Sequence, residues 1–167
     1  MTLAASNNIT KAPEVQRFAD TLIVEYHPDL SEAKILYLFT DSNRTQGGHT
    51  VLGTTGKLSS VQRFLSGGLE AVEDGYDFII MISKMTWDGH SDKQKTALVD
   101  HQLSHCRLKS KTNPKTGEIR RWWAVVGHEV EEFVGVVERH GLDVFPRGAR
   151  MQEAVSRQLS LDSAPAT

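Results

Sequence analysis

The sequence predicts an α+β fold with a small mixed or antiparallel sheet, because helix-like and strand-like patterns occur in the same chain of 167 residues. Apolar residues recur at spacings of three and four over residues 13–27, which is typical of an amphipathic helix. A continuous apolar run at 78–82 is bounded by Gly75 and Lys84, which indicates a buried strand. Both kinds of element are therefore expected within one core.

The first half of the chain supplies a helix and several strands. Pro13 stands at a first-turn position that tolerates proline, so a helix is expected to begin there. The segments 35–39 and 49–54 are apolar or β-prone and flank the turn-rich SNRTQGG, which suggests that they are paired strands. Residues 58–73 fit a helix that a pair of glycines interrupts.

The second half predicts two helices around a hairpin. Residues 91–107 read as a helix with Ser91 as the N-cap. The turn formers Asn-Pro-Lys-Thr-Gly predict a β-hairpin over 107–126. A last helix is expected over 128–140, where Gly141 ends it.

Length and composition favour one domain over residues 13–147, with 1–12 as a flexible N-terminal segment and 148–167 as a partly disordered tail. A formal net charge of -2 excludes a uniformly basic nucleic-acid-binding protein, and a single cysteine excludes an internal disulfide. The N-terminus lacks the pattern of a signal peptide, and no apolar run is long enough to cross a membrane. We therefore expect a cytoplasmic protein without a membrane partner.

The stretch DHQLSHC places His101 and His105 one helical turn apart, so that both imidazoles project from one face and can reach one ion. The predicted helix is apolar nearly all round and is therefore expected to be buried. An alternative interpretation is that each histidine bonds a carbonyl or a carboxylate in the core.

A third ligand would favour zinc, because catalytic zinc sites commonly take three protein ligands and keep one position for water. His128, in VGHEVEEF, is the best candidate. The residues that could replace it or support a ligand are Glu129, Glu131 and Glu132. Asp100 could also orient an imidazole from beside the site.

The runs DFIIMISKMTWDGHSDKQKTALVDHQLSHC and WWAVVGHEVEEF resemble the small phage-type metallopeptidases, whose pattern includes D-H-E-L-x-H on a helix and a later G-H-x-V-E-E-F. The likeness covers roughly residues 13–147, and the layout is more distantly similar to the SprT-like zinc peptidases. The resemblance implies His101, His105 and His128 as ligands of Zn²⁺, a protein or peptide substrate, and a host cytoplasm if the chain is phage-encoded. It also implies that the strand at 78–82 lies beside the metal cleft and holds the substrate.

Gln102 departs from this pattern, in which a glutamate acts as the general base. An amide cannot exchange a proton near neutral pH, so zinc and substrate binding should survive while turnover falls by about 10² to 10⁴-fold. Either an active peptidase has had its glutamate replaced by engineering, or the chain is a natural pseudoenzyme.

The hairpin region 107–121 carries six basic residues and one acidic residue. Its cations Lys109, Lys111, Arg120 and Arg121 lie near two tryptophans, so a contact with nucleic acid or a partner protein is one interpretation. The alternative function is therefore a non-catalytic, zinc-stabilised binding module. A solvated hairpin with its tryptophans in the core is the simpler alternative.

The remaining candidates are expected to be structural. Cys106 is interpreted as a buried thiol on the histidine-bearing helix, too far round the wheel to be a fourth ligand. The histidines at element ends or in loops are expected to be solvated; these are His27, His49, His90 and His140.

Overall fold

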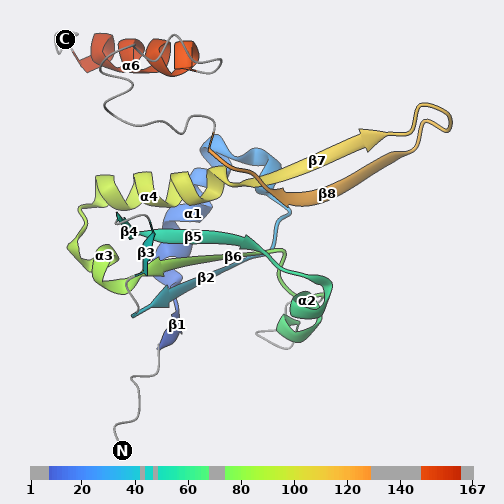
Figure 1. The fold of residues 1–167 in the computed structure, drawn as a ribbon, viewed down its shortest axis with the longest axis horizontal. Coiled ribbons are helices and arrows are strands. Elements are labelled where there is room, and N and C mark those ends of the chain that lie inside the picture. The colour runs from blue at the N-terminus through green and yellow to red at the C-terminus, as the bar shows by residue number, and fades with distance from the viewer. Residues whose placement is uncertain (1–7, 42–43, 47–48, 68–73, 129–147, 163–167) are drawn as a thin grey trace, which may run out of the picture. The chain divides into compact units, whose positions relative to one another are not determined.

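The computed structural model describes residues 8–41, 44–46, 49–67, 74–128 and 148–162. The chain forms two compact units, Met1–Val126 and Gly127–Thr167. The first unit contains a four-stranded sheet, two two-stranded ribbons and most of the helices (Figure 1).

The four-stranded sheet has the order β1-β2-β6-β5. Its strands are β1 (Ile9–Lys11), β2 (Ile35–Thr40), β6 (Phe78–Ser83) and β5 (Gly53–Lys57). The central strands β2 and β6 run parallel, whereas β1 and β5 pair antiparallel with their neighbours. The sheet is therefore mixed, and the predicted α+β class is confirmed.

The predicted pairing of 35–39 with 49–54 is wrong. Strand β4 (His49–Val51) instead forms a local ribbon with β3 (Arg44–Gln46), and β5 pairs with β6. Residues 44–46 are separated from 49–51 by only a short connection, and closing a short loop costs less entropy than closing a long one. Strand β4 therefore pairs with β3 and not with β2.

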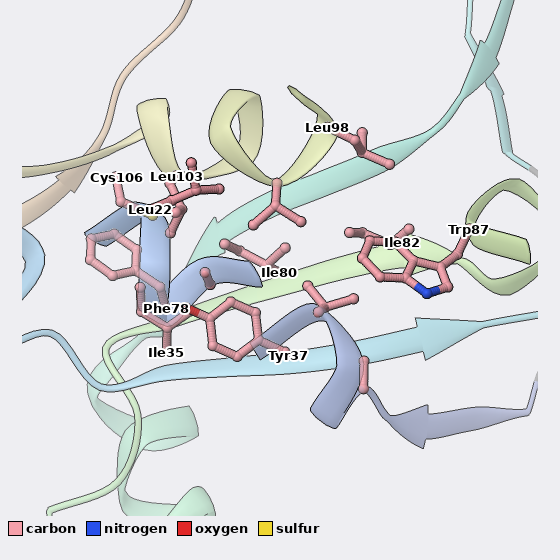
Figure 2. Packing of buried hydrophobic residues seen from close by; sticks show 14 of the residues in the cluster. Leu22, Ile35, Tyr37, Phe78, Ile80, Ile82, Trp87, Leu98, Leu103 and Cys106 are labelled. Carbon is pink, nitrogen blue, oxygen red and sulfur yellow. The ribbon is translucent and has the colours of Figure 1, made fainter. Parts of the chain in front are cut away.

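Alternate residues of the two central strands form the core. Ile35, Tyr37 and Phe39 of β2 and Phe78, Ile80 and Ile82 of β6 are all buried. Two helices, α1 (Pro13–Tyr26) and α4 (Asp92–Ser104), contribute buried residues to the same cluster. Figure 2 shows Leu22, Leu98 and Leu103 packed between these helices and the strands. This packing holds α4 against one face of the sheet.

Helix α4 is buried on one side only, so the prediction of a helix buried all round is wrong. Its buried residues are Leu98, Val99, Gln102 and Leu103. The histidine-bearing side is exposed because the sheet and α1 cover only the opposite side. Ser91 caps the helix through a reciprocal bond with Gln94, as predicted.

The remaining described elements connect or extend this framework. They are the 3-10 turn η1 (Pro28–Leu30), α2 (Ser60–Ser66), α3 (Lys84–Gly89), the hairpin strands β7 (Cys106–Thr112) and β8 (Ile119–Val125), and α6 (Gly148–Asp162). The predicted hairpin is confirmed. Of the ambiguous helix at 58–73, residues 60–66 are helical, and 68–73 lie outside the described residues.

Both ends of the chain contain elements that the sequence did not predict. Residues 9–11, placed in a segment expected to be flexible, pair with β2, although their exposed side chains give no apolar pattern. Residues 148–162, placed in the expected tail, form α6 in the second unit. The predicted helix at 128–140 lies outside the described residues except for His128. No described helix is both long and apolar enough to cross a membrane.

Candidate metal centre

Helix α4 presents two imidazoles at its C-terminal end. The Nε2 atoms of His101 and His105 lie 3.3 Å apart, and the two rings meet nearly edge to face at 83°. His101 is exposed and His105 is half-buried, so both rings are accessible to an ion from solvent. The exposed side of the helix thus carries the pair, in the arrangement that the spacing of four residues predicts.

The hairpin fixes the orientation of the second ring. The Nδ1 atom of His105 lies 2.7 Å from the carbonyl oxygen of Val126, and the Val126 N–H donates to the His105 carbonyl at 2.9 Å. A carbonyl oxygen only accepts, so Nδ1 carries the proton and, in the neutral ring, Nε2 keeps its lone pair for a metal. A backbone carbonyl in this position is a common outer partner of metal-bound histidine.

His128 completes a group of three imidazoles. It follows β8 by three residues, and one ligand nitrogen from each of His101, His105 and His128 lies within 4.8 Å of the others. Tetrahedral zinc with bonds of 2.0–2.1 Å requires ligand nitrogens about 3.3 Å apart. The first pair already has this separation, and the third nitrogen would need to approach by roughly 1.5 Å at most. The three histidines could therefore hold a metal ion.

Gln102 lies on the buried side of α4, with only 3% of its surface exposed. The hydroxyl oxygen of Thr55, on the edge strand β5, lies 2.8 Å from Gln102 Oε1 and 3.0 Å from the Gln102 carbonyl oxygen. A Cβ atom at Gly53 would stand 3.2 Å from two atoms of the Gln102 side chain. Gly53 thus allows β5 to approach this side chain closely, and Thr55 holds the amide by donating a hydrogen bond.

Replacing Thr55 with valine should therefore lower the free energy of unfolding by about 1 to 3 kcal/mol, because the Gln102 acceptor loses its donor in a mostly buried position. Chemical denaturation of the variant measures this change. Thr54→Val is the matched control, since its side chain lies on the opposite face of the same strand. An equal loss in both variants would mean that β-strand packing, and not the bond to Gln102, causes the effect.

The strand beside this part of α4 is β5, and not the strand at 78–82 as the resemblance implied. Strand β6 lies inside the sheet, where β2 and β5 occupy both of its hydrogen-bonding edges. It cannot add a substrate strand. Strand β5 is the outer strand on that side of the sheet among the described residues, and its Thr55 contacts Gln102 of α4. The sequence did not mark Gly53 or Thr55 as neighbours of Gln102, because Thr55 and Gln102 are 47 positions apart in the chain.

Asp100 and His27 form a contact that the sequence did not predict. His27 is buried, not solvated, and its Nε2 lies 2.6 Å from an Asp100 carboxylate oxygen. His27 caps the C-terminal end of α1, so this bond ties α1 to α4. Asp100 therefore orients the buried His27 ring. His90 is likewise half-buried and bonds the Thr86 carbonyl.

Cys106 begins β7 and does not belong to α4, because its pairing with Val125 ends the helix at Ser104. The predicted burial of the thiol is confirmed, at 1% exposure. Burial, followed by the nearby charge of Asp29, raises the pKa of Cys106 to about 12. A neutral buried thiol is a poor zinc ligand, since the thiolate is the form that binds metal.

Several other predicted residues fall outside the histidine group. Glu129, Glu131, Glu132 and His140 lie outside the described residues, as does the side chain of His49. The hairpin cations Lys109, Lys111, Arg120 and Arg121 are exposed along β7 and β8.

Comparison with known proteins identifies a family for the chain. A family model with the description "Putative phage metallopeptidase" matches residues 7–157. Neither a curated protein nor a solved structure matches the chain. The family match spans the sheet, α4 and the three histidines, and it covers far more than half of the sequence. The chain therefore belongs to this phage metallopeptidase family.

Proposed function

We propose that the chain is a zinc-dependent peptidase by descent, with His101, His105 and His128 as the zinc ligands and with Gln102 at the position of the general base. The observation that carries the proposal is the separation of 3.3 Å between the His101 and His105 Nε2 atoms, together with a third imidazole nitrogen within 4.8 Å. Three imidazoles are also the ligand set that leaves a fourth zinc position for water or substrate. A peptide or protein substrate follows from the family.

A bound zinc ion would polarise the scissile carbonyl and lower the pKa of its water. The protein itself contributes by fixing the positions and orientations of the ligand side chains. The Val126 carbonyl keeps the His105 ring in one tautomer and one orientation, and the core contacts of Leu98, Val99 and Leu103 fix the helix that carries both histidines. Little reorganisation of this histidine pair is then needed when the metal binds.

Gln102 limits the chemistry in this proposal. Its amide accepts a hydrogen bond from Thr55 but cannot take a proton from water or return one to a leaving amine. We therefore expect zinc and peptide binding with little or no hydrolysis. The same residue favours a second candidate function, a zinc-stabilised binding module that does not cleave.

The edge strand β5 is the proposed binding site for an extended substrate peptide. Its inner edge pairs with β6, and among the described residues no strand pairs with its outer edge. An extended peptide could add to this edge through main-chain hydrogen bonds. Thr55 on this strand contacts Gln102, so a peptide added there would pass close to the base position.

Metal analysis tests the proposed ligand set. After treatment with a chelator and dialysis against Zn²⁺, the chain should retain about one zinc ion, because the part of the chain that the structure describes brings one group of three imidazoles together. Substitution with Co²⁺ should give the strong visible absorption of a tetrahedral site. Failure to retain zinc, or the weak absorption of an octahedral ion, would count against the proposal.

A further inference from the structure

We propose that one face of the β7–β8 hairpin binds single-stranded nucleic acid. The inference concerns a surface separate from the histidine group and does not depend on peptidase activity. It is carried by the register of the hairpin, which sorts the basic and aromatic residues of this segment between two faces.

Directly paired residues of an antiparallel ribbon lie on the same face. The register pairs Lys109 with Trp122 and Lys111 with Arg120, and pairs Arg107 with Ala124. Because the pleat alternates, all of these residues lie on one face, with neighbours along each strand about 6.8 Å apart. We call Arg107, Lys109, Lys111, Arg120 and Trp122 the basic face.

The opposite face of the hairpin anchors it to the core. Leu108 pairs with Trp123 on that side, and the Trp123 ring lies 5.8 Å from the Phe78 ring, centroid to centroid. Cys106, on the same side, is buried. Arg121 also belongs to this opposite face, because it pairs with Ser110. The hairpin is therefore held from one side, and Figure 1 shows its strands extending beyond α4 and the sheet.

The basic face carries four cations. Arg107, Lys109, Lys111 and Arg120 are all exposed, and none of them has an ion pair with another residue in the described part of the chain. Glu118, near the tip, is the one carboxylate of the hairpin. A row of such cations attracts a polyanion, because each phosphate contact releases condensed counterions.

Trp122 distinguishes nucleic acid from an acidic peptide as the partner. Trp122 is 37% exposed, and it borders an open hollow of ≈ 790 Å³. The other residues that line this hollow are Lys111, Asn113, Pro114, Glu118, Ile119 and Arg120. An acidic peptide could bind through its carboxylates to the cations alone, without a contact to Trp122. An exposed indole next to cations matches surfaces that stack a base while they bind the flanking phosphates. Stacking requires an unpaired base, which favours a single strand over a duplex.

Fluorescence anisotropy with a labelled oligothymidylate of about 20 nucleotides tests the proposal. The triple variant Lys109→Gln, Lys111→Gln, Arg120→Gln should lower the slope of log K against log salt by about 2, since each phosphate contact on a single strand contributes about 0.7. At 0.15 M salt this corresponds to roughly 50-fold weaker binding. Trp122→Leu should weaken binding about tenfold through lost stacking.

Matched controls separate the two faces. Lys109→Gln and Arg121→Gln each remove one positive charge from the hairpin, but only Lys109 lies on the basic face. Lys109→Gln should lower the salt slope by about 0.7, and Arg121→Gln should leave it unchanged. Circular dichroism and an unchanged midpoint of chemical denaturation confirm that each variant keeps the parent fold.

Three results would overturn the proposal. An equal loss of affinity in Lys109→Gln and Arg121→Gln would show that net charge, and not the basic face, drives binding. Binding of polyglutamate as tight as that of the oligonucleotide, with no effect of Trp122→Leu, would identify an acidic protein as the partner. Tighter binding of a duplex than of its single strand would contradict base stacking.

Discussion

Gln102→Glu should raise peptide hydrolysis by about 10² to 10⁴-fold over the present chain when zinc is bound, because it supplies the general base that an amide cannot replace. The substitution fits the site. Glutamate has nearly the shape of glutamine, and the Thr55 hydroxyl that now donates to Gln102 Oε1 at 2.8 Å can donate to a carboxylate. Cleavage of a quenched peptide library, measured with and without a chelator, gives the rates.

Gln94→Glu is the matched control, because it adds the same charge to the first turn of the same helix, far along α4 from the histidines. A glutamate there can still form the capping box. This variant should cleave no faster than the parent. If Gln102→Glu also fails to cleave while it retains zinc, the binding module becomes the better description, and the zinc ligands are unaffected by that outcome.

His101→Ala and His128→Ala should each weaken zinc binding by more than 100-fold. Losing a residue that only hydrogen-bonds to a ligand typically weakens metal binding by about 10- to 100-fold, so a larger loss identifies a direct ligand. Both side chains are exposed, so neither substitution should disturb the core. Competition with a chromophoric chelator measures the affinity. The zinc-induced rise in the melting temperature should disappear in parallel, because a ligand stabilises only the state that binds it.

His90→Asn provides the control for the loss of an imidazole outside the group, and it should bind zinc as the parent does. Unchanged affinity in His128→Ala would remove that residue from the ligand set. Glu129, Glu131 and Glu132 would then be the residues to replace with glutamine, since a carboxylate is the other usual third ligand of such sites.

The features that the sequence predicted well are local ones. The spacing of His101 and His105 places both rings on one side of any helix, whatever that helix contacts. Ser91 and Gln94 specify the start of α4 through their own side chains. The Asn-Pro-Lys-Thr-Gly turn brings together the strands that it joins, so the hairpin needs no distant information.

The features that the sequence did not predict depend on distant contacts. Thr55 and Gln102 are separated by 47 positions, and His27 and Asp100 by 73. No local pattern reveals that a histidine after α1 is buried against a carboxylate on α4. The parallel pairing of β2 with β6 is also a long-range choice, which the apolar runs allow but do not specify.

The junction between His105 and Val126 makes the hairpin a separable insertion. Two hydrogen bonds close its base, one from the His105 ring to the Val126 carbonyl and one from the Val126 N–H to the His105 carbonyl. The strand pairs beyond Cys106 and Val125 therefore do not set the spacing of the ligands. Shortening both strands by two residues would remove part of the ribbon and preserve which residues face each way. Shortening both strands by one residue would move each remaining side chain to the opposite face of the ribbon. Relatives could thus exchange or lose this appendage in even steps while the histidine group stays in place.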